Sequence, residues 1–368
     1  MKLNLQELKH KISKTCLILI DKIVHFLKIN KSSFFEYFVL LLILTFAIII
    51  RINGLDFYSL DEDSFSIYTY STTIYDHHNP YLRILTSDMI HNQKYPSYPP
   101  LYFYLGLIPL YFGYSSYPSW IFFMKIFFLI PVDFSIAILI FIILKKSPNT
   151  NPWFRVFAVY AWLVNRWALY IYTYALIDTF TIFFILLSLY YFYSQPEFSY
   201  FLLGVAIATK LFPILLLPLY LISHRPKRVY ILLTYLFFAI MPFFLVSLPF
   251  IISSPEAYYR SMLFSATRHG DLKMRVIGPE LMPFFGASGV NTRIPLIIAY
   301  LGFYCIHWKK AFNIYTFTTL GLLIWNLMNP NVYYQYWVWF IPFALILFGR
   351  IISTNASSDS NVEIPLSG

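Results

Sequence analysis

Long apolar runs recur along this sequence and constrain its fold more than any other feature. They lie at residues 34–50, 119–144, 153–171, 177–194, 229–252, 291–307, 312–328 and 334–350. An apolar helix of about 20 residues crosses the hydrocarbon core of a bilayer, which is about 30 Å thick. Because a backbone in lipid must satisfy its own hydrogen bonds, and the runs lack the alternation of barrel strands, they predict an all-α, polytopic bundle of transmembrane helices.

The overall composition excludes a soluble domain. The chain is 59% hydrophobic and only 12% charged, whereas a soluble domain carries roughly 25% charged residues. The net charge of +10 would indicate nucleic-acid binding in a soluble protein. Here the basic residues stand mostly in short segments beside the apolar runs, so membrane topology explains them and no nucleic-acid partner is expected.

Two further apolar segments are irregular. The segment 99–113 is short and its apolar part starts after Pro99 and Pro100, which favours a surface helix over a full span. Residues 200–222 are interrupted near Lys210 and Pro213, which predicts a hairpin of two half-length helices that rises from the cytoplasm and returns. With these segments the bundle has about 9–11 membrane segments.

The positive-inside rule orients the chain. With both termini in the cytoplasm, most Lys and Arg residues fall inside and most acids outside. Cys16 and Cys305 then lie near the cytoplasmic side, where free thiols are expected. The expected regions are an amphipathic cytoplasmic arm (1–33, alternatively a loose basic arm), the transmembrane domain (34–351) with outer loops at 51–118 and 253–290, and a disordered cytoplasmic tail (352–368).

Three adjacent acids, Asp61, Glu62 and Asp63, follow the first apolar run. Such a run is often a solvated loop or a helix N-cap. The functional interpretation is a general base at the outer membrane face. A further interpretation is that Asp61 and Asp63 bind a divalent ion such as Mg²⁺ or Mn²⁺.

Lys210 stands between two apolar half-helices, where a cation is expensive. It either extends to the membrane interface or binds a lipid phosphate as a point charge. Lys125, Asp133 and Arg166 also fall within apolar runs, and an Asp133–Arg166 ion pair would explain two of them.

Two aromatic segments suit the interfacial zone of a membrane. Tyr98 lies in a proline-rich segment that a rigid turn also explains. Gln335 and Tyr336 belong to the segment 329–337, which joins the last two apolar runs on the outer side. Amides and aromatic rings together match a sugar's hydroxyls and apolar faces.

The order of these elements resembles the GT-C superfamily of membrane glycosyltransferases. Leu60-Asp61-Glu62-Asp63 is similar to the acidic motif of its first outer loop, and Tyr98-Pro99-Pro100-Leu101 is similar to the Pro-Leu element that closes that loop. Further elements resemble the family of the first glycosylphosphatidylinositol mannosyltransferase. These are Lys125 with Asp133, Ile177-Asp178-Thr179, Gly204 to Lys210 with Pro213 and Pro218, and Gln335-Tyr336-Trp337-Val338-Trp339. Arg268-His269-Gly270-Asp271 is a loose counterpart of its Arg/Asp/His-rich segment.

The resemblance implies an inverting transfer of a hexose, expected to be mannose, from a polyprenyl- or dolichyl-phosphate donor. The acceptor is a lipid-linked or protein-linked glycan at the outer (lumenal) face. The implied site has Asp61, Asp63 and Glu62 as catalytic acids, Lys210, Arg268 and Arg275 at the donor phosphate, and Tyr98, Asp178, His269, Gln335 and Tyr336 at the substrates. The membrane is the cell membrane in a microbe or the endoplasmic reticulum in a eukaryote.

Two other function classes remain open. A lipid or solute transporter, or flippase, would line a path with the acids and Lys210, but a path needs polar residues across the membrane. Here they crowd toward one face, which favours an enzyme. A polytopic scaffold without catalysis has no evident use for the acid run or for Lys210.

Overall fold

The computed structural model describes residues 34–55, 62–86, 95–147, 149–267, 293–309, 313–329 and 336–359. Within these ranges all regular structure is helical, as the sequence predicts. The predicted arm at 1–33 lies outside the described residues, as does most of the second outer loop beyond Thr267.

Within the described ranges, three helices are long and apolar enough to cross a membrane, by length and composition. They are Phe34–Asn53, the continuous helix Tyr117–Lys145, and Val229–Ser253. The second consists of α5 (Tyr117–Met124), a π-helical turn η2 (Lys125–Leu129) and α6 (Ile130–Lys145). Together with the shorter apolar helices, they indicate a helical membrane bundle.

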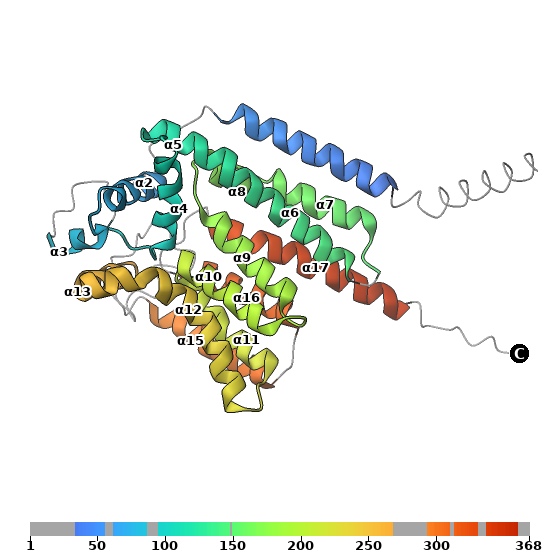
Figure 1. Ribbon diagram of the computed structural model, residues 1–368. Coiled ribbons are helices and arrows are strands. Elements are labelled where there is room, and N and C mark those ends of the chain that lie inside the picture. Colours follow the sequence, from blue (N-terminus) through green and yellow to red (C-terminus); the bar gives the residue numbers. More distant parts are fainter. Residues whose placement is uncertain are drawn as a thin grey trace, which may run out of the picture.

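The shorter helices complete the bundle (Figure 1). Their bounds are α7 (Pro152–Leu163), α8 (Arg166–Thr173), α9 (Asp178–Tyr191), α10 (Pro196–Thr209), η3 (Phe212–Leu216), α11 (Leu217–His224), α15 (Ile294–Lys309), α16 (Ile314–Met328) and α17 (Trp337–Asp359). The first helix lies along α6 and α7, to which Arg51 and Glu36 join it by ion pairs (Figure 1). α10 packs between α9 and α12 (Val229–Ser253).

The predicted first outer loop contains helices that pack as a separate layer. These are α2 (Glu62–Tyr75), η1 (Pro80–Leu82), α3 (Arg83–Thr86) and α4 (Leu101–Tyr111). The helix α4, which falls in the irregular segment 99–113, packs against α2 and α5. α13 (Pro255–Thr267) covers η1 and α3, so parts of the two predicted outer loops meet at one end of the bundle (Figure 1).

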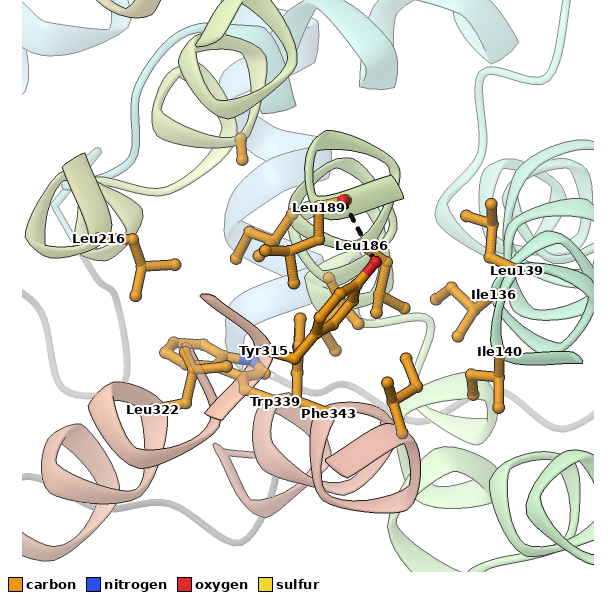
Figure 2. Packing of buried hydrophobic residues seen from close by; sticks show 14 of the residues in the cluster. Ile136, Leu139, Ile140, Leu186, Leu189, Leu216, Tyr315, Leu322, Trp339 and Phe343 are labelled. Carbon is orange, nitrogen blue, oxygen red and sulfur yellow. Dashed lines mark hydrogen bonds between the residues drawn. The ribbon is translucent and has the colours of Figure 1, made fainter. Parts of the chain in front are cut away.

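Two hydrophobic cores correspond to these two layers. The larger core lies among α6, α9, α16 and α17, where Tyr315, Leu186, Ile140 and Phe343 are in one cluster (Figure 2). The smaller core lies under α2, α4 and α5 and includes Phe103 and Trp120. The outer helices are therefore held on the bundle by a second buried core that is rich in aromatic residues.

Residues 200–222 break and turn back, as the predicted hairpin requires. α10 ends at Thr209 and Lys210 is extended (φ −147°, ψ 139°). The chain then returns, because His224 at the end of α11 lies 3.2 Å from the hydroxyl of Tyr200 near the start of α10. The two ends of the segment are thus neighbours, and the break lies at Lys210 as predicted.

The predicted ion pair between Asp133 and Arg166 is wrong. Asp133 instead binds Arg51 at the end of the first helix, with Nη2 to Oδ2 at 2.9 Å and Nε to Oδ2 at 3.2 Å. Arg166 is exposed at the start of α8. Lys125 donates to the carbonyl of Gly54 at 2.9 Å. Lys125 and Asp133 therefore fix the end of the first helix, just before the acid run.

Two predicted boundaries also differ. The run 153–171 forms two helices, α7 and α8. The side chain of Asn165 accepts a hydrogen bond from the backbone N–H of Ala168 at 2.9 Å and caps the start of α8. The last helix continues to Asp359, eight residues into the region predicted as a disordered tail. The rest of that tail lies outside the described residues.

Candidate functional site

Lys210 is the centre of the candidate site. It follows the last residue of α10, and Pro213 lies in the first turn of η3, where it cannot donate to a helix continuing from α10. The residue is only 8% exposed. A buried ammonium group requires partners that offset its lost hydration.

The direct partner of this ammonium group is Asp178. Its Oδ1 atom accepts from Lys210 Nζ and also from the indole Nε1 of Trp339, at 2.9 Å for the latter. Asp178 opens α9, where the positive end of the helix dipole stabilises a carboxylate. The sequence assigned Lys210 to a phosphate and Asp178 to a substrate, and the structure places them as a buried ion pair.

Three aromatic rings surround the same ammonium group. Its Nζ lies 4.6 Å from the ring centroid of Trp339 and 5.5 Å from those of Tyr98 and Tyr336. Phe212 stacks on Trp339 at 4.0 Å. Ring faces at these distances attract a cation, so the site holds a desolvated positive charge between aromatic walls.

Asp63 joins the site through Tyr98. The Tyr98 hydroxyl donates to Asp63 Oδ1 at 3.1 Å. Burial raises the pKa of Tyr98 well above its usual range, and the charge of Asp63 raises it further. The hydroxyl therefore stays protonated at neutral pH and remains a donor to the Asp63 carboxylate.

A cluster of three hydroxyl groups lies one turn from these residues. The oxygen of Thr181 is 2.8 Å from the Tyr102 hydroxyl and 2.9 Å from that of Thr209. Tyr102 follows Tyr98 by four residues, Thr181 follows Asp178 by three, and Thr209 precedes Lys210. All three side chains are buried. The cluster thus joins α4, α9 and α10 beside the residues that they contribute.

Five residues that the sequence singled out are therefore brought together. They are Asp63, Tyr98, Asp178, Lys210 and Tyr336. The remaining candidates lie outside the described residues: Asp61, the side chain of Glu62, Arg268, His269, Arg275 and Gln335.

Sequence reasoning gave no role to Trp339 or to the three hydroxyl residues. Trp339 stands in the Gln335–Trp339 motif, so a signal was present, but only the fold brings its indole nitrogen to Asp178. Thr181 and Thr209 carried no signal beyond their spacing from Asp178 and Lys210. Spacing along one helix does not reveal a contact with another helix.

A metal centre has no support among the described residues, which contain no cluster of three or more His, Cys, Asp or Glu able to hold an ion. Of the predicted metal pair, the structure describes the side chain of Asp63 alone. Mg²⁺ or Mn²⁺ dependence stays a prediction from the acid run.

Lys210 is the group of the site that can pair with an anion. To do so it must turn from Asp178, whose carboxylate would keep its bond to Trp339 and the positive end of α9. The site can also hold an apolar ring face against Tyr98, Tyr336 or Trp339. The carboxylate of Asp63 lies next to the Tyr98 ring, through the hydrogen bond from the Tyr98 hydroxyl. No protein-family model, curated protein or solved structure shows significant similarity to this chain.

Proposed function

We propose that this protein is a GT-C type membrane glycosyltransferase. It transfers a hexose, expected to be mannose, from a polyprenyl- or dolichyl-phosphate donor to a lipid-linked or protein-linked glycan. The observation that carries the proposal is the meeting of Lys210, Asp178, Asp63 and three aromatic rings at a break in an apolar helix. These groups supply a cation for a phosphate, a carboxylate base and walls for a sugar.

The proposed reaction is a single displacement. The carboxylate of Asp63 takes the proton of an acceptor hydroxyl. The acceptor oxygen forms a bond to C1 of the donor sugar, while the bond from C1 to the phosphate oxygen breaks with its electrons leaving on the phosphate. Attack opposite the leaving group inverts the configuration at C1. Asp61, which lies outside the described residues, is the other candidate base.

Lys210 stabilises the charge that grows on the departing phosphate. Such stabilisation is strongest where water is excluded and the cation is already in place. The low exposure of Lys210 and its ring contacts supply both conditions. In the structure Asp178 neutralises Lys210. The proposed mechanism requires Lys210 to turn to the donor phosphate, while Trp339 and the positive end of α9 continue to hold the Asp178 carboxylate.

The apolar surroundings fit a donor with an isoprenoid tail. Such a tail stays in the bilayer, so its phosphate meets the enzyme at the membrane surface. The break at Lys210 lies between apolar half-helices, and the α2–α4 layer covers the same end of the bundle. The acceptor then approaches from the outer or lumenal face, with both termini in the cytoplasm.

A transfer assay tests the proposal. Purified protein is given radiolabelled polyprenyl-phosphate mannose or glucose with a membrane glycolipid extract. We expect transfer by the wild type, and a loss of at least about 100-fold for Asp63→Asn or Lys210→Met. The matched control is Asp76→Asn, which removes an exposed acid just after the end of α2 and should transfer normally.

Absence of transfer by the wild type, or full transfer by both site variants, would contradict the proposal. Movement of the labelled donor between leaflets without transfer would instead support a flippase. Cysteine introduced at position 76, in a chain with Cys16 and Cys305 replaced by serine, tests the topology, because labelling only from the cytoplasmic side would reverse the orientation.

A further inference from the structure

A second cluster of charged and aromatic residues lies at the ends of α6 and α17, on another part of the bundle from Lys210. Lys145 and Lys146 end α6, and Arg350 lies near the end of the apolar part of α17. The sequence places these residues on the cytoplasmic side. The proposed transfer reaction uses none of them.

Each of two cations in this cluster rests on a tyrosine. Lys146 Nζ donates to the Tyr190 hydroxyl at 2.7 Å and lies 3.9 Å from the centroid of that ring. The Arg350 guanidinium carbon lies 4.5 Å from the ring centroid of Tyr315. Ring contacts hold the two cations in place without neutralising them.

The two pairs adjoin each other. The Tyr315 hydroxyl donates to the carbonyl of Leu189, the residue before Tyr190, at 3.3 Å (Figure 2). Gly349 lets α17 approach α6 and α7 closely, because a Cβ atom there would meet Leu144 at 2.5 Å. Arg350 and Lys146 therefore belong to one surface.

This surface carries an unbalanced positive charge. Among the described residues, neither Lys146 nor Arg350 forms an ion pair with a carboxylate, and Lys146 is exposed. Nearby Arg155 differs, because Glu36 neutralises it with contacts of 2.6 and 2.8 Å. The fold gives Arg155 a partner and leaves Lys146 and Arg350 without one in the described part of the chain.

Exposed apolar side chains lie on α17, the helix that carries Arg350, and on its neighbour α7. Phe348 and Ile352 of α17 are 57% and 48% exposed, and Phe157 of α7 is 54% exposed. α7 and α17 pack together. Helices that end at the charged cluster therefore also present apolar side chains to their surroundings, as helices in contact with lipid do.

We propose that Lys146 and Arg350 bind the phosphate headgroup of an anionic phospholipid. Arg350 offers a planar set of donors to phosphate oxygens and Lys146 offers a point charge. The Tyr190 hydroxyl accepts a hydrogen bond from Lys146. The hydrogen of this hydroxyl is then free to be donated to another acceptor, such as a phosphate oxygen. Anionic lipids are plentiful in cytoplasmic leaflets, which matches the predicted side.

Thermal unfolding of the purified full-length chain in neutral detergent tests this site. Phosphatidylglycerol should raise the midpoint by about 2–4 °C. Phosphatidylcholine with the same acyl chains, and inorganic phosphate alone, should give less than half that shift. The double variant Lys146→Gln/Arg350→Gln should lose the phosphatidylglycerol shift. The control Lys227→Gln/Arg228→Gln removes the same charge from exposed residues before α12 and should keep it.

Three results would overturn the proposal: an equal shift with phosphatidylcholine, an equal shift with inorganic phosphate, or a full shift in the Lys146/Arg350 double variant. If that double variant does not fold, Arg350→Lys serves instead, because it keeps the charge and should bind less lipid in native mass spectrometry. Retention of as much phosphatidylglycerol as the wild type would then contradict the site. These measurements do not depend on glycosyl transfer.

Discussion

The indole nitrogen of Trp339 donates to Asp178 through the same carboxylate oxygen that pairs with Lys210. The indole therefore fixes the orientation of the carboxylate, and its ring also covers the ammonium group. A single residue of α17 thus links a charge from α9 to a charge from α10. The geometry of the ion pair depends on how α17 docks.

Trp339→Phe keeps an aromatic ring and removes the donor. A hydrogen bond to a charged group contributes about 1.5–3 kcal/mol, so we expect slower transfer and a lower unfolding temperature. The matched control is Trp325→Phe, because the buried indole nitrogen of Trp325 has no hydrogen-bond partner among the described residues. Equal losses in the two variants would show that the bond to Asp178 contributes nothing.

Thr181→Val removes the central hydroxyl between Tyr102 and Thr209. We expect a stability loss of about 1–3 kcal/mol, because both partners lose a buried hydrogen bond. Thr181→Ser should restore most of it. Thr318→Val is the control, since its buried hydroxyl has no partner in the part of the chain that the structure describes. Thermal unfolding compares the three, and a costlier Thr318→Val would contradict the assignment.

Breaking the pair between Arg51 and Asp133 should be severe. Both side chains are at most 1% exposed, and removing one partner of a buried pair costs about 3–5 kcal/mol. Arg51→Met and Asp133→Leu should each lower the unfolding temperature strongly, while the double variant should recover much of the loss. Arg260→Gln breaks the exposed Arg260–Glu256 pair and should change little. A double variant worse than both single variants would argue against the pair.

Gly204→Ala tests the close approach of α12 to α10, the helix that ends just before Lys210. A Cβ atom at Gly204 would lie 2.5 Å from the Ala239 carbonyl oxygen, so α10 and α12 would have to separate. We expect destabilisation and reduced transfer. Gly302→Ala is the control, because a Cβ there meets nothing within 4 Å and alanine stabilises a helix by about 1 kcal/mol relative to glycine. If Gly204→Ala changed neither the unfolding temperature nor the transfer rate, α12 would have to move away from α10 at little energetic cost.

Much of the fold follows from local sequence. The apolar runs predict helices whatever their neighbours, because a lipid-embedded backbone has few other ways to satisfy its hydrogen bonds. Lys210 and Pro213 locate the break in the hairpin, since a proline near a helix end interrupts the hydrogen-bond ladder. The sequence also marked Asp63, Tyr98, Asp178, Lys210 and Tyr336 as candidates.

Tertiary structure decided which of these residues are partners. Asp133 pairs with Arg51, 82 residues away, and not with Arg166. Asp178 pairs with Lys210 and Trp339, which come from two other segments. Helical periodicity tells which face of a helix is apolar, but the docking of one helix on another fixes which buried charges meet. The sequence therefore determined the helices and the residues that needed partners, and the packing between helices determined the partners themselves.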